Sequence, residues 1–328
     1  MFKLKITVAK HAGFCSGVKK AIEIAEETAK NSGKVYVYGQ LVHNERVIKE
    51  LEKKGVVFVE NMDDIPENSV TALRAHGEPG TTYEKLKQKN IFGERLKDAT
   101  CPLVTLVHNI AIKLKNSGYE VIIFGKKNHP EAIGISYFIK GGSTFIVEDP
   151  KDAPLVVGYI NKNNFGKAAI ISQTTMSVNG YKKLIDGINK SFNNKLENSK
   201  KEFSGVHKDK LYEQFKKVEL NLKDLSYPFV FADTICNPTK QRQADTEEIA
   251  KGADLMIVIG GKNSSNSKEL VAKCEEFGVE TYFIQSAEQL KKEWFSGKEN
   301  IGVTAGASTP DITITEVVER IKQITNIK

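Results

Sequence analysis

Residues 98–105, DATCPLVT, place Cys101 between a threonine and a proline, at a point where a short strand is expected to give way to a helix. Proline suits the first turn of a helix, because the backbone N–H that it lacks would have no partner there. Cys15, in AGFCSGVKKAI, and Cys236, in DTICNPTKQRQ, stand at similar junctions. The chain is therefore expected to contain three equivalent turns, each carrying a thiol.

The three cysteines begin three repeats with the same order of elements: a helix, a strand that ends in glycine, a polar loop, a second helix and a further strand. The strand-ending glycine lies 24 residues after its cysteine in every repeat, at Gly39, Gly125 and Gly260. The residue 28 positions after the cysteine lies in the polar loop and is His43, His129 or Ser264. Agreement at both spacings in all three copies indicates a triplicated unit.

Buried strands that alternate with amphipathic helices predict parallel sheets, in which the polar loops gather at the carboxyl ends of the strands. We therefore predict an α/β fold of three similar units with small parallel sheets. The units are expected to surround a pseudo-threefold axis as a cloverleaf, with the three cysteines facing the centre.

The expected division of the chain is a first unit at 1–98, a second at 99–190, a charged insert at 191–230 and a third unit at 231–310. A C-terminal helix at 311–328 is expected to pack on the first unit. The lysines of the insert and the helical periodicity of LYEQFKKVEL, residues 211–220, indicate a surface helix.

Composition and charge argue against several classes of protein. The 328 residues carry 48 Lys and Arg against 41 Asp and Glu, a formal charge of +7, without the clustered basic stripe of a nucleic-acid-binding protein. No secretion signal is recognisable, and no apolar run approaches the roughly 18 residues that a membrane span needs. We expect a cytoplasmic protein. Four cysteines are too few for a disulfide scaffold and instead suggest metal binding or catalysis.

Three of the four cysteines precede predicted helices, where backbone N–H groups and the helix dipole stabilise an anionic sulfur. Thiolates select zinc, copper(I) or an iron-sulfur cluster. No C-x-x-C pair typical of structural zinc sites occurs. A cubane cluster held by three thiolates would leave one iron open to a substrate. Cys274, which has no counterpart in the other repeats, is interpreted as an ordinary core residue.

The polar loops supply hydrogen-bond donors that suit an anion such as a diphosphate, to which charge-assisted hydrogen bonds contribute roughly 1.5–3 kcal/mol each. These loop residues are His43, Asn44, His76, His129, Thr174, Ser264, Ser265, Asn266 and Ser308. A simple helix-capping role for the serine-rich loop is the alternative. His11, His108 and His207 lie outside these loops and are interpreted as ordinary surface or core residues.

Glu131 follows His129 by two residues and differs from the other loop residues in being acidic. A carboxyl shielded from water among anion-binding groups would have a raised pKa and could deliver protons. We predict that Glu131 is the general acid. The alternative is that Glu131 only stabilises the first turn of the helix after Pro130.

Nine segments carry a family pattern: GFCSGVKKAI, LVHNERVI, AHGEPG, DATCPLV, NHPEAIG, SQTTMSV, DTICNPTKQRQ, GGKNSSNSKEL and GVTAGASTPD. In order, and over nearly the whole chain, they resemble the LytB/IspH family of 4-hydroxy-3-methylbut-2-enyl diphosphate reductases of the non-mevalonate (MEP) isoprenoid pathway. The resemblance implies a cloverleaf around an oxygen-sensitive [4Fe-4S] cluster held by Cys15, Cys101 and Cys236. It implies an oxidoreductase that removes the substrate hydroxyl as water, with two electrons and two protons, to give isopentenyl and dimethylallyl diphosphate.

The resemblance also implies roles for single residues. The catalytic residues would be Glu131, Thr174 and His129: Thr174 would hold the substrate oxygen near the open iron, and Glu131 would supply protons. Thr239 would lie close to the cluster. The diphosphate would be surrounded by His43, His76, His129, Ser264, Ser265, Asn266 and Ser308. Electrons would come from ferredoxin or flavodoxin, in agreement with the absence of G-x-G-x-x-G.

The chain departs from the family pattern at two places. Pro238 stands where the family often has alanine. The insert is longer than usual for the family, and docking of an acidic electron donor on it is a second interpretation beside a solvated surface helix. A non-catalytic iron-sulfur sensor that binds a diphosphate and a zinc-dependent or thiol-based hydrolase on the same scaffold are the two rival functions. A monomer is expected, because a fold closed on its own threefold leaves no obligatory edge for a partner.

Overall fold

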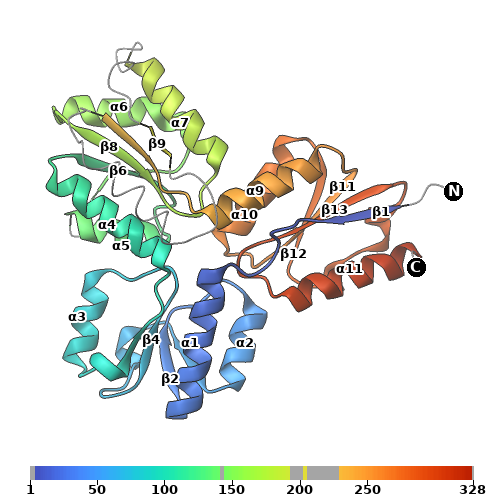
Figure 1. Ribbon diagram of the computed structural model, residues 1–328, viewed down its shortest axis with the longest axis horizontal. Helices are drawn as coiled ribbons and strands as arrows, with labels where there is room; N and C mark the ends of the chain where they lie inside the picture. The colour runs from blue at the N-terminus through green and yellow to red at the C-terminus, as the bar shows by residue number, and fades with distance from the viewer. Residues whose placement is uncertain (1–3, 141–143, 193–201, 205–228, 327–328) are drawn as a thin grey trace. The chain divides into compact units, whose positions relative to one another are not determined.

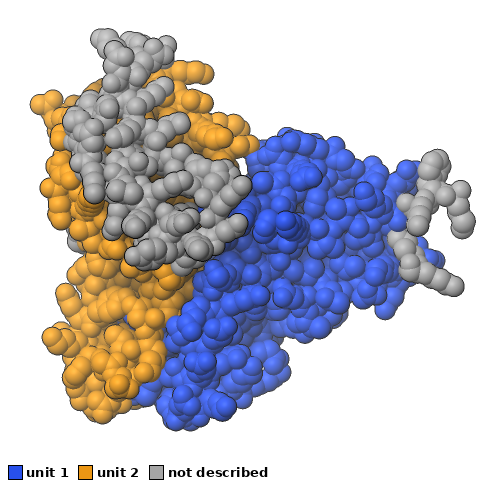
Figure 2. Space-filling model, in the orientation of Figure 1, with its two compact units in different colours: residues 1–65, 69–74, 237–328 blue, residues 66–68, 75–236 orange. Residues whose placement is uncertain are grey.

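The computed structural model describes residues 4–140, 144–192, 202–204 and 229–326 (Figure 1). The chain forms two compact units (Figure 2). Unit 1 contains residues 1–65, 69–74 and 237–328, and unit 2 contains residues 66–68 and 75–236. His207 and the helix predicted at 211–220 lie outside the described residues.

Strands and helices alternate along most of the chain. The described strands are β1 (Lys5–Val8), β2 (Val35–Tyr38), β3 (Val56–Val59), β4 (Thr71–Leu73), β5 (Leu96–Asp98), β6 (Glu120–Phe124), β7 (Ile146–Val147), β8 (Ala168–Ser172), β9 (Glu202–Ser204), β10 (Phe229–Asp233), β11 (Leu255–Ile259), β12 (Glu280–Ile284) and β13 (Asn300–Ala305). The described α-helices are α1 (Ser16–Ser32), α2 (Glu45–Lys53), α3 (Gly80–Gln88), α4 (Pro102–Asn116), α5 (Pro130–Lys140), α6 (Ala153–Lys162), α7 (Val178–Ser191), α9 (Asn237–Ala250), α10 (Ser265–Glu276) and α11 (Asp311–Thr325). Short 3₁₀ helices are η1 (Met62–Asp64), η2 (Gly93–Arg95), η3 (Pro150–Asp152), η5 (Ala287–Gln289) and η6 (Lys292–Phe295).

Unit 1 contains a parallel sheet with the strand order β1-β13-β11-β12. All five residues of β11 are buried, as expected for a central strand covered on both faces. Helix α11 packs on this sheet through Val317 and Ile321, which share one hydrophobic core with residues of β11 and β13 and with Leu4 and Ile6. In the other sheet of unit 1, β2 lies between β3 and β4.

Unit 2 contains a parallel sheet with the strand order β7-β6-β8-β10-β9. Strands β6 and β8 are buried along their whole length. Alternate residues of these strands contribute to two different cores: Ile123 and Ile171 to one, and Ile122 and Ile170 to the other. Burial on both faces explains why these strands are continuous apolar runs in the sequence.

The prediction of an α/β fold with small parallel sheets is confirmed. The strands that lead to Cys15 and Cys236 do not join the sheet of the repeat that follows them. Strand β10 pairs with β8 of the preceding repeat, whereas β1 pairs with β13 of the third repeat. The predicted unit ranges and the pseudo-threefold axis stay predictions. Among the described residues, no helix is both long and apolar enough to cross a membrane.

Candidate functional site

Each of the three predicted cluster ligands lies at the start of a helix. Cys15 is the N-cap of α1, and its Sγ accepts a hydrogen bond from the Val18 amide at 3.5 Å. Cys101 is the N-cap of α4, with Pro102 as the first helical residue. Cys236 directly precedes α9. All three cysteines are half-buried, so a sulfur at each position can bind a ligand beside the positive end of a helix dipole.

In unit 2, Glu131 and Thr174 form a buried pair. The Thr174 amide donates to one carboxylate oxygen of Glu131 at 2.7 Å, and the Thr174 hydroxyl donates to the other at 2.8 Å. The two residues are only 1% and 5% exposed. Burial raises the pKa of Glu131 to about 7, although the two hydrogen bonds from Thr174 oppose this shift. Near neutral pH the carboxyl can therefore both hold and release a proton.

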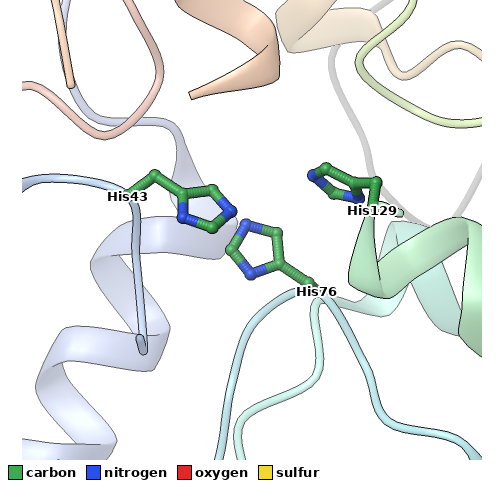
Figure 3. Close-up of side chains that lie close together, drawn as sticks. All are labelled: His43, His76 and His129. Atoms are coloured by element: carbon green, nitrogen blue, oxygen red, sulfur yellow. The ribbon is translucent and has the colours of Figure 1, made fainter. Parts of the chain in front are cut away.

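His129 and His76 lie next to this pair in the same unit. The Glu131 amide donates to Nδ1 of His129 at 3.2 Å, which leaves Nε2 of a neutral His129 ring to carry the proton. The His76 and His129 rings are 5.4 Å apart between centroids in a T-shaped arrangement (Figure 3). Two imidazoles and one carboxyl of the predicted site are thus gathered in unit 2.

Backbone hydrogen bonds connect two of the cysteines to these residues. The Cys236 amide donates to the Thr174 carbonyl at 3.1 Å. The Cys101 amide donates to the carbonyl of Ala75, the residue before His76, at 3.0 Å. In unit 2, therefore, each cysteine is held beside a residue of the predicted site.

In unit 1, Asn266 connects three predicted site segments. Its Nδ2 donates to the Thr239 hydroxyl at 3.3 Å, and its Oδ1 accepts from the Ala307 amide at 3.0 Å. The Ala307 carbonyl in turn accepts from the Cys15 amide at 3.1 Å. Asn266 is 3% exposed, so this connection is sheltered from water.

The loop of His43 is fixed by the neighbouring loops of unit 1. The Ser308 hydroxyl donates to the His43 carbonyl at 3.2 Å. A Cβ atom at Gly261 would clash with the same carbonyl oxygen, so only glycine permits this close approach. Burial, with the positive charges of Arg74 and Lys268, lowers the pKa of His43 to about 4. His43 is therefore neutral at pH 7.

The serine-rich loop forms the start of α10. Ser264 is the N-cap, and its Oγ accepts from the Ser267 amide at 3.3 Å. The capping role considered as an alternative is thus present, but it occupies Ser264 alone. Ser265 and Asn266 follow as the first residues of the helix, where backbone N–H groups favour an anion.

A family model described as "LytB protein" matches residues 6–322. The chain belongs to the LytB family. It is 39% identical over 323 residues to a protein of Nitratiruptor sp., which covers 98% of this chain and 99% of the relative. A protein of Aquifex aeolicus is 35% identical, with 97% and 96% covered. Both relatives are named 4-hydroxy-3-methylbut-2-enyl diphosphate reductase.

Two solved structures are similar to this LytB chain. One is the E-1-hydroxy-2-methyl-but-2-enyl-4-diphosphate reductase from Plasmodium falciparum, with a TM-score of 0.79, 28% identity, and coverage of 98% of this chain and 88% of that one. The other is an (E)-4-hydroxy-3-methyl-but-2-enyl diphosphate reductase described as the terminal enzyme of the non-mevalonate pathway, with a TM-score of 0.59, 33% identity, and coverage of 98% and 100%.

The cysteine and the histidines that were interpreted as ordinary core or surface residues lie elsewhere in the LytB fold. Cys274 is fully buried in α10, and burial raises its thiol pKa to about 12, as expected for a core cysteine. His108 is buried with its ring 4.7 Å from that of Phe138, and burial lowers its pKa to about 4. The amide and Nδ1 of His11 are both within hydrogen-bonding distance of the Asp245 carboxylate.

Two supporting residues of the LytB site were missed from the sequence. Gln173 is fully buried; it accepts from the Lys126 amide at 3.0 Å and donates to the Thr175 hydroxyl at 2.8 Å. It therefore holds the loop that leads to His129. The Thr234 hydroxyl accepts from the Ser172 amide at 2.7 Å and joins the ends of β8 and β10. In both cases the sequence offered one signal, a polar residue directly after an apolar strand, where a buried polar group needs a hydrogen-bond partner.

Proposed function

We propose that this chain is a 4-hydroxy-3-methylbut-2-enyl diphosphate reductase. The reaction would remove the substrate hydroxyl as water, with two electrons and two protons, and would yield isopentenyl and dimethylallyl diphosphate. The names of the relatives support the substrate and the reaction. The observation that carries the proposal is the buried Glu131–Thr174 pair, a proton donor with a pKa of about 7 whose carboxylate is hydrogen-bonded to a hydroxyl.

Cys15, Cys101 and Cys236 are the residues that would hold a [4Fe-4S] cluster. Their fit rests on the donor set: three half-buried sulfurs at helix starts, one of which already accepts a backbone hydrogen bond. Such a cluster supplies electrons and, with three protein ligands, an iron corner that lacks one. Zinc is the less suitable ion, because the structural sites that it forms with cysteines are closed by a fourth protein ligand.

Glu131 would hold the proton that converts the leaving hydroxyl to water. When the carboxyl is ionised, the Thr174 hydroxyl donates to it; when the carboxyl is protonated, the same hydroxyl can accept the proton's hydrogen bond. Thr174 would thereby orient the substrate oxygen and relay protons from Glu131. Burial of both groups excludes the bulk water that would otherwise compete for the proton.

The diphosphate would be bound by neutral donors. The residues proposed for it are His43, His76, His129, Ser264, Ser265, Asn266 and Ser308. His43 is neutral at pH 7 and would donate a hydrogen bond, and α10 would contribute its N-terminal backbone N–H groups. Thr239 would lie beside the cluster, held by Asn266.

Ferredoxin or flavodoxin would deliver the electrons one at a time. The protein would act in the cytoplasm, as a monomer. The sequence lacks the G-x-G-x-x-G pattern of a dinucleotide-binding site, in agreement with an external protein donor. The insert at 191–230 could dock this donor in the second interpretation, and most of its residues lie outside those that the structure describes.

The deciding experiment is an assay of iron, sulfide and turnover on anaerobically purified protein. We expect a brown protein with about four irons and four sulfides per chain, which reduces the substrate with a reduced dye. Cys101→Ala should lose iron and activity, whereas the matched variant Cys274→Ala should keep both, because Cys274 lies in the core. A colourless protein with zinc would favour the hydrolase, and iron without turnover would favour the sensor.

A further inference from the structure

His108, on α4, is buried against the loop at residues 75–79, here named the His76 loop. It is 7% exposed. A Cβ atom at Gly77, the residue after His76, would lie only 3.1 Å from Cε1 of the His108 ring. Gly77 also has a φ of +77°, a conformation that favours glycine. The backbone of the His76 loop therefore lies directly against the imidazole of His108.

The same ring packs against α5, the helix that follows His129. A Cβ atom at Gly134 would lie 3.4 Å from Nε2 of His108. The Phe138 ring, one turn further along α5, is 4.7 Å from the His108 ring between centroids. His108 thus packs against both segments that bring the rings of His76 and His129 together (Figure 3).

Helix α4 holds His108 in register with the His76 loop. The Cys101 amide, at the start of α4, donates to the Ala75 carbonyl at 3.0 Å. One turn later, Cγ1 of Val104 would lie 3.2 Å from a Cβ atom at Gly77. Cys101, Val104 and His108 share one face of the helix, because their spacing follows the helical repeat. The loop is therefore packed against this face over two turns of α4.

The contacts of His108 depend on the shape of its ring. Its Nε2 is buried and has no hydrogen-bond partner among the residues that the structure describes. Burial lowers the pKa of His108 to about 4, although the Asp98 carboxylate opposes this shift, so the ring is uncharged at pH 7. A buried nitrogen without a partner costs stability and gives no directional bond. The imidazole acts instead as a flat spacer between Gly77 and Gly134.

We propose that His108 is a positioning residue: its ring sets the separation between the His76 loop and α5, and thereby the place of the His76 imidazole in the diphosphate site. The inference rests on the proposed function, which includes His76 among the groups that bind the diphosphate. Without the ring, the loop can move into the vacated space, and His76 loses its place. The bonds between Glu131 and Thr174 do not involve His108, so proton delivery should change less than binding.

The test compares His108→Ala with Leu114→Ala, a control that removes another buried side chain of α4. The readouts on anaerobically purified protein are the Kd for inorganic diphosphate by calorimetry, KM and kcat with a reduced dye, and the free energy of unfolding. His108→Ala should raise Kd and KM about 10-fold, the effect of weakening one hydrogen bond to a charged ligand, with a smaller change in kcat. Leu114→Ala should lose stability but keep the wild-type Kd.

A double-mutant cycle with His76→Ala separates positioning from general support of the fold. If His108 acts through His76, adding His108→Ala to His76→Ala should change Kd by less than about twofold. Multiplication of the two single effects would overturn the inference. A wild-type Kd in His108→Ala, or an equally raised Kd in Leu114→Ala, would overturn it as well.

Two further variants test the role of ring shape and carry the test if His108→Ala does not fold. His108→Phe keeps a flat ring without the nitrogen, and its Kd should stay within about threefold of the wild type. His108→Gln keeps a polar nitrogen without the ring, and its Kd should rise about 10-fold. The opposite order, or equal Kd values in the two variants, would refute the inference. Wild-type protein that neither binds diphosphate nor reduces the substrate would instead refute the proposed function.

Discussion

The predicted site residues of the two units respond to burial in opposite directions. In unit 2, burial raises the pKa of Glu131 to about 7. In unit 1, burial and two nearby cations lower the pKa of His43 to about 4. Both shifts favour the neutral form, because a low-dielectric surrounding penalises charge of either sign. Of these two groups, Glu131 is brought close to neutral pH and His43 is moved away from it, so Glu131 rather than His43 can exchange protons at neutral pH.

The hydrogen bonds that hold the predicted site residues also differ between the two units. In unit 2, the Glu131 and Thr174 side chains bond to each other. In unit 1, two of the bonds that hold site residues use backbone groups: the His43 carbonyl accepts from Ser308, and the Ala307 amide donates to Asn266. Asn266 also bonds the Thr239 hydroxyl, but neither of these side chains is ionisable. A proton relay needs side-chain contact, whereas a rigid set of hydrogen-bond donors needs a fixed backbone. We infer that unit 2 supplies the proton chemistry and unit 1 supplies most of the anion binding.

The largest expected effect follows from replacing the proton donor. Glu131→Gln can keep both hydrogen bonds with Thr174 but cannot release a proton, so turnover should fall by about 100- to 10,000-fold while the iron content is unchanged. Steady-state kinetics with a reduced dye would measure the loss. The control is Glu94→Gln, which alters a fully exposed carboxylate of the same unit. Turnover within threefold of wild type would show that Glu131 is not the acid.

A second consequence is a pH-dependent stability. Because the pKa of Glu131 is raised from 4.5 to about 7 on folding, the folded state binds more protons than the unfolded state between these values. Stability therefore falls as pH rises through this window. Relative to Glu131→Gln, the wild type should lose about 2–3 kcal/mol of unfolding free energy between pH 5 and pH 8. Denaturant titrations of both proteins at several pH values measure this difference, and a constant difference would contradict the raised pKa.

The local structure around each cysteine was predictable because its signals are local. Strands β2, β6 and β11 end just before Gly39, Gly125 and Gly260, and Pro102 begins α4, as the sequence pattern indicated. The raised pKa of Glu131 was also predictable, since a carboxyl amid polar loops after a buried strand is expected to be shielded from water. Its role as the acid stays a prediction. Repeat spacing thus predicted the helix starts that carry most of the site.

The connections between distant segments were not predictable in this way. Strand β1 pairs with β13, which lies nearly 300 residues later, and the pattern of β1 is compatible with several partners. The Arg242–Gly13 bond spans 229 positions. Hydrophobic periodicity reports which face of an element is buried but not which element covers it. Arg242 therefore looked like any polar residue of a helix until the fold placed it beside the Cys15 loop.

The smallest effect is expected from Gly261→Ala, a substitution that tests whether unit 1 acts through a fixed backbone. Gly261→Ala would force a methyl group against the His43 carbonyl, and a backbone atom cannot move aside cheaply. The expected cost is about 1–3 kcal/mol of unfolding free energy. We also expect a raised KM for the diphosphate substrate and a smaller change in kcat, because the proposed proton relay of Glu131 and Thr174 belongs to the other unit. Gly252→Ala is the control, since its added Cβ would meet no atom within 4 Å. A Gly261→Ala variant with wild-type KM and lowered kcat would reverse the division of roles, because it would place unit 1 in the chemical step.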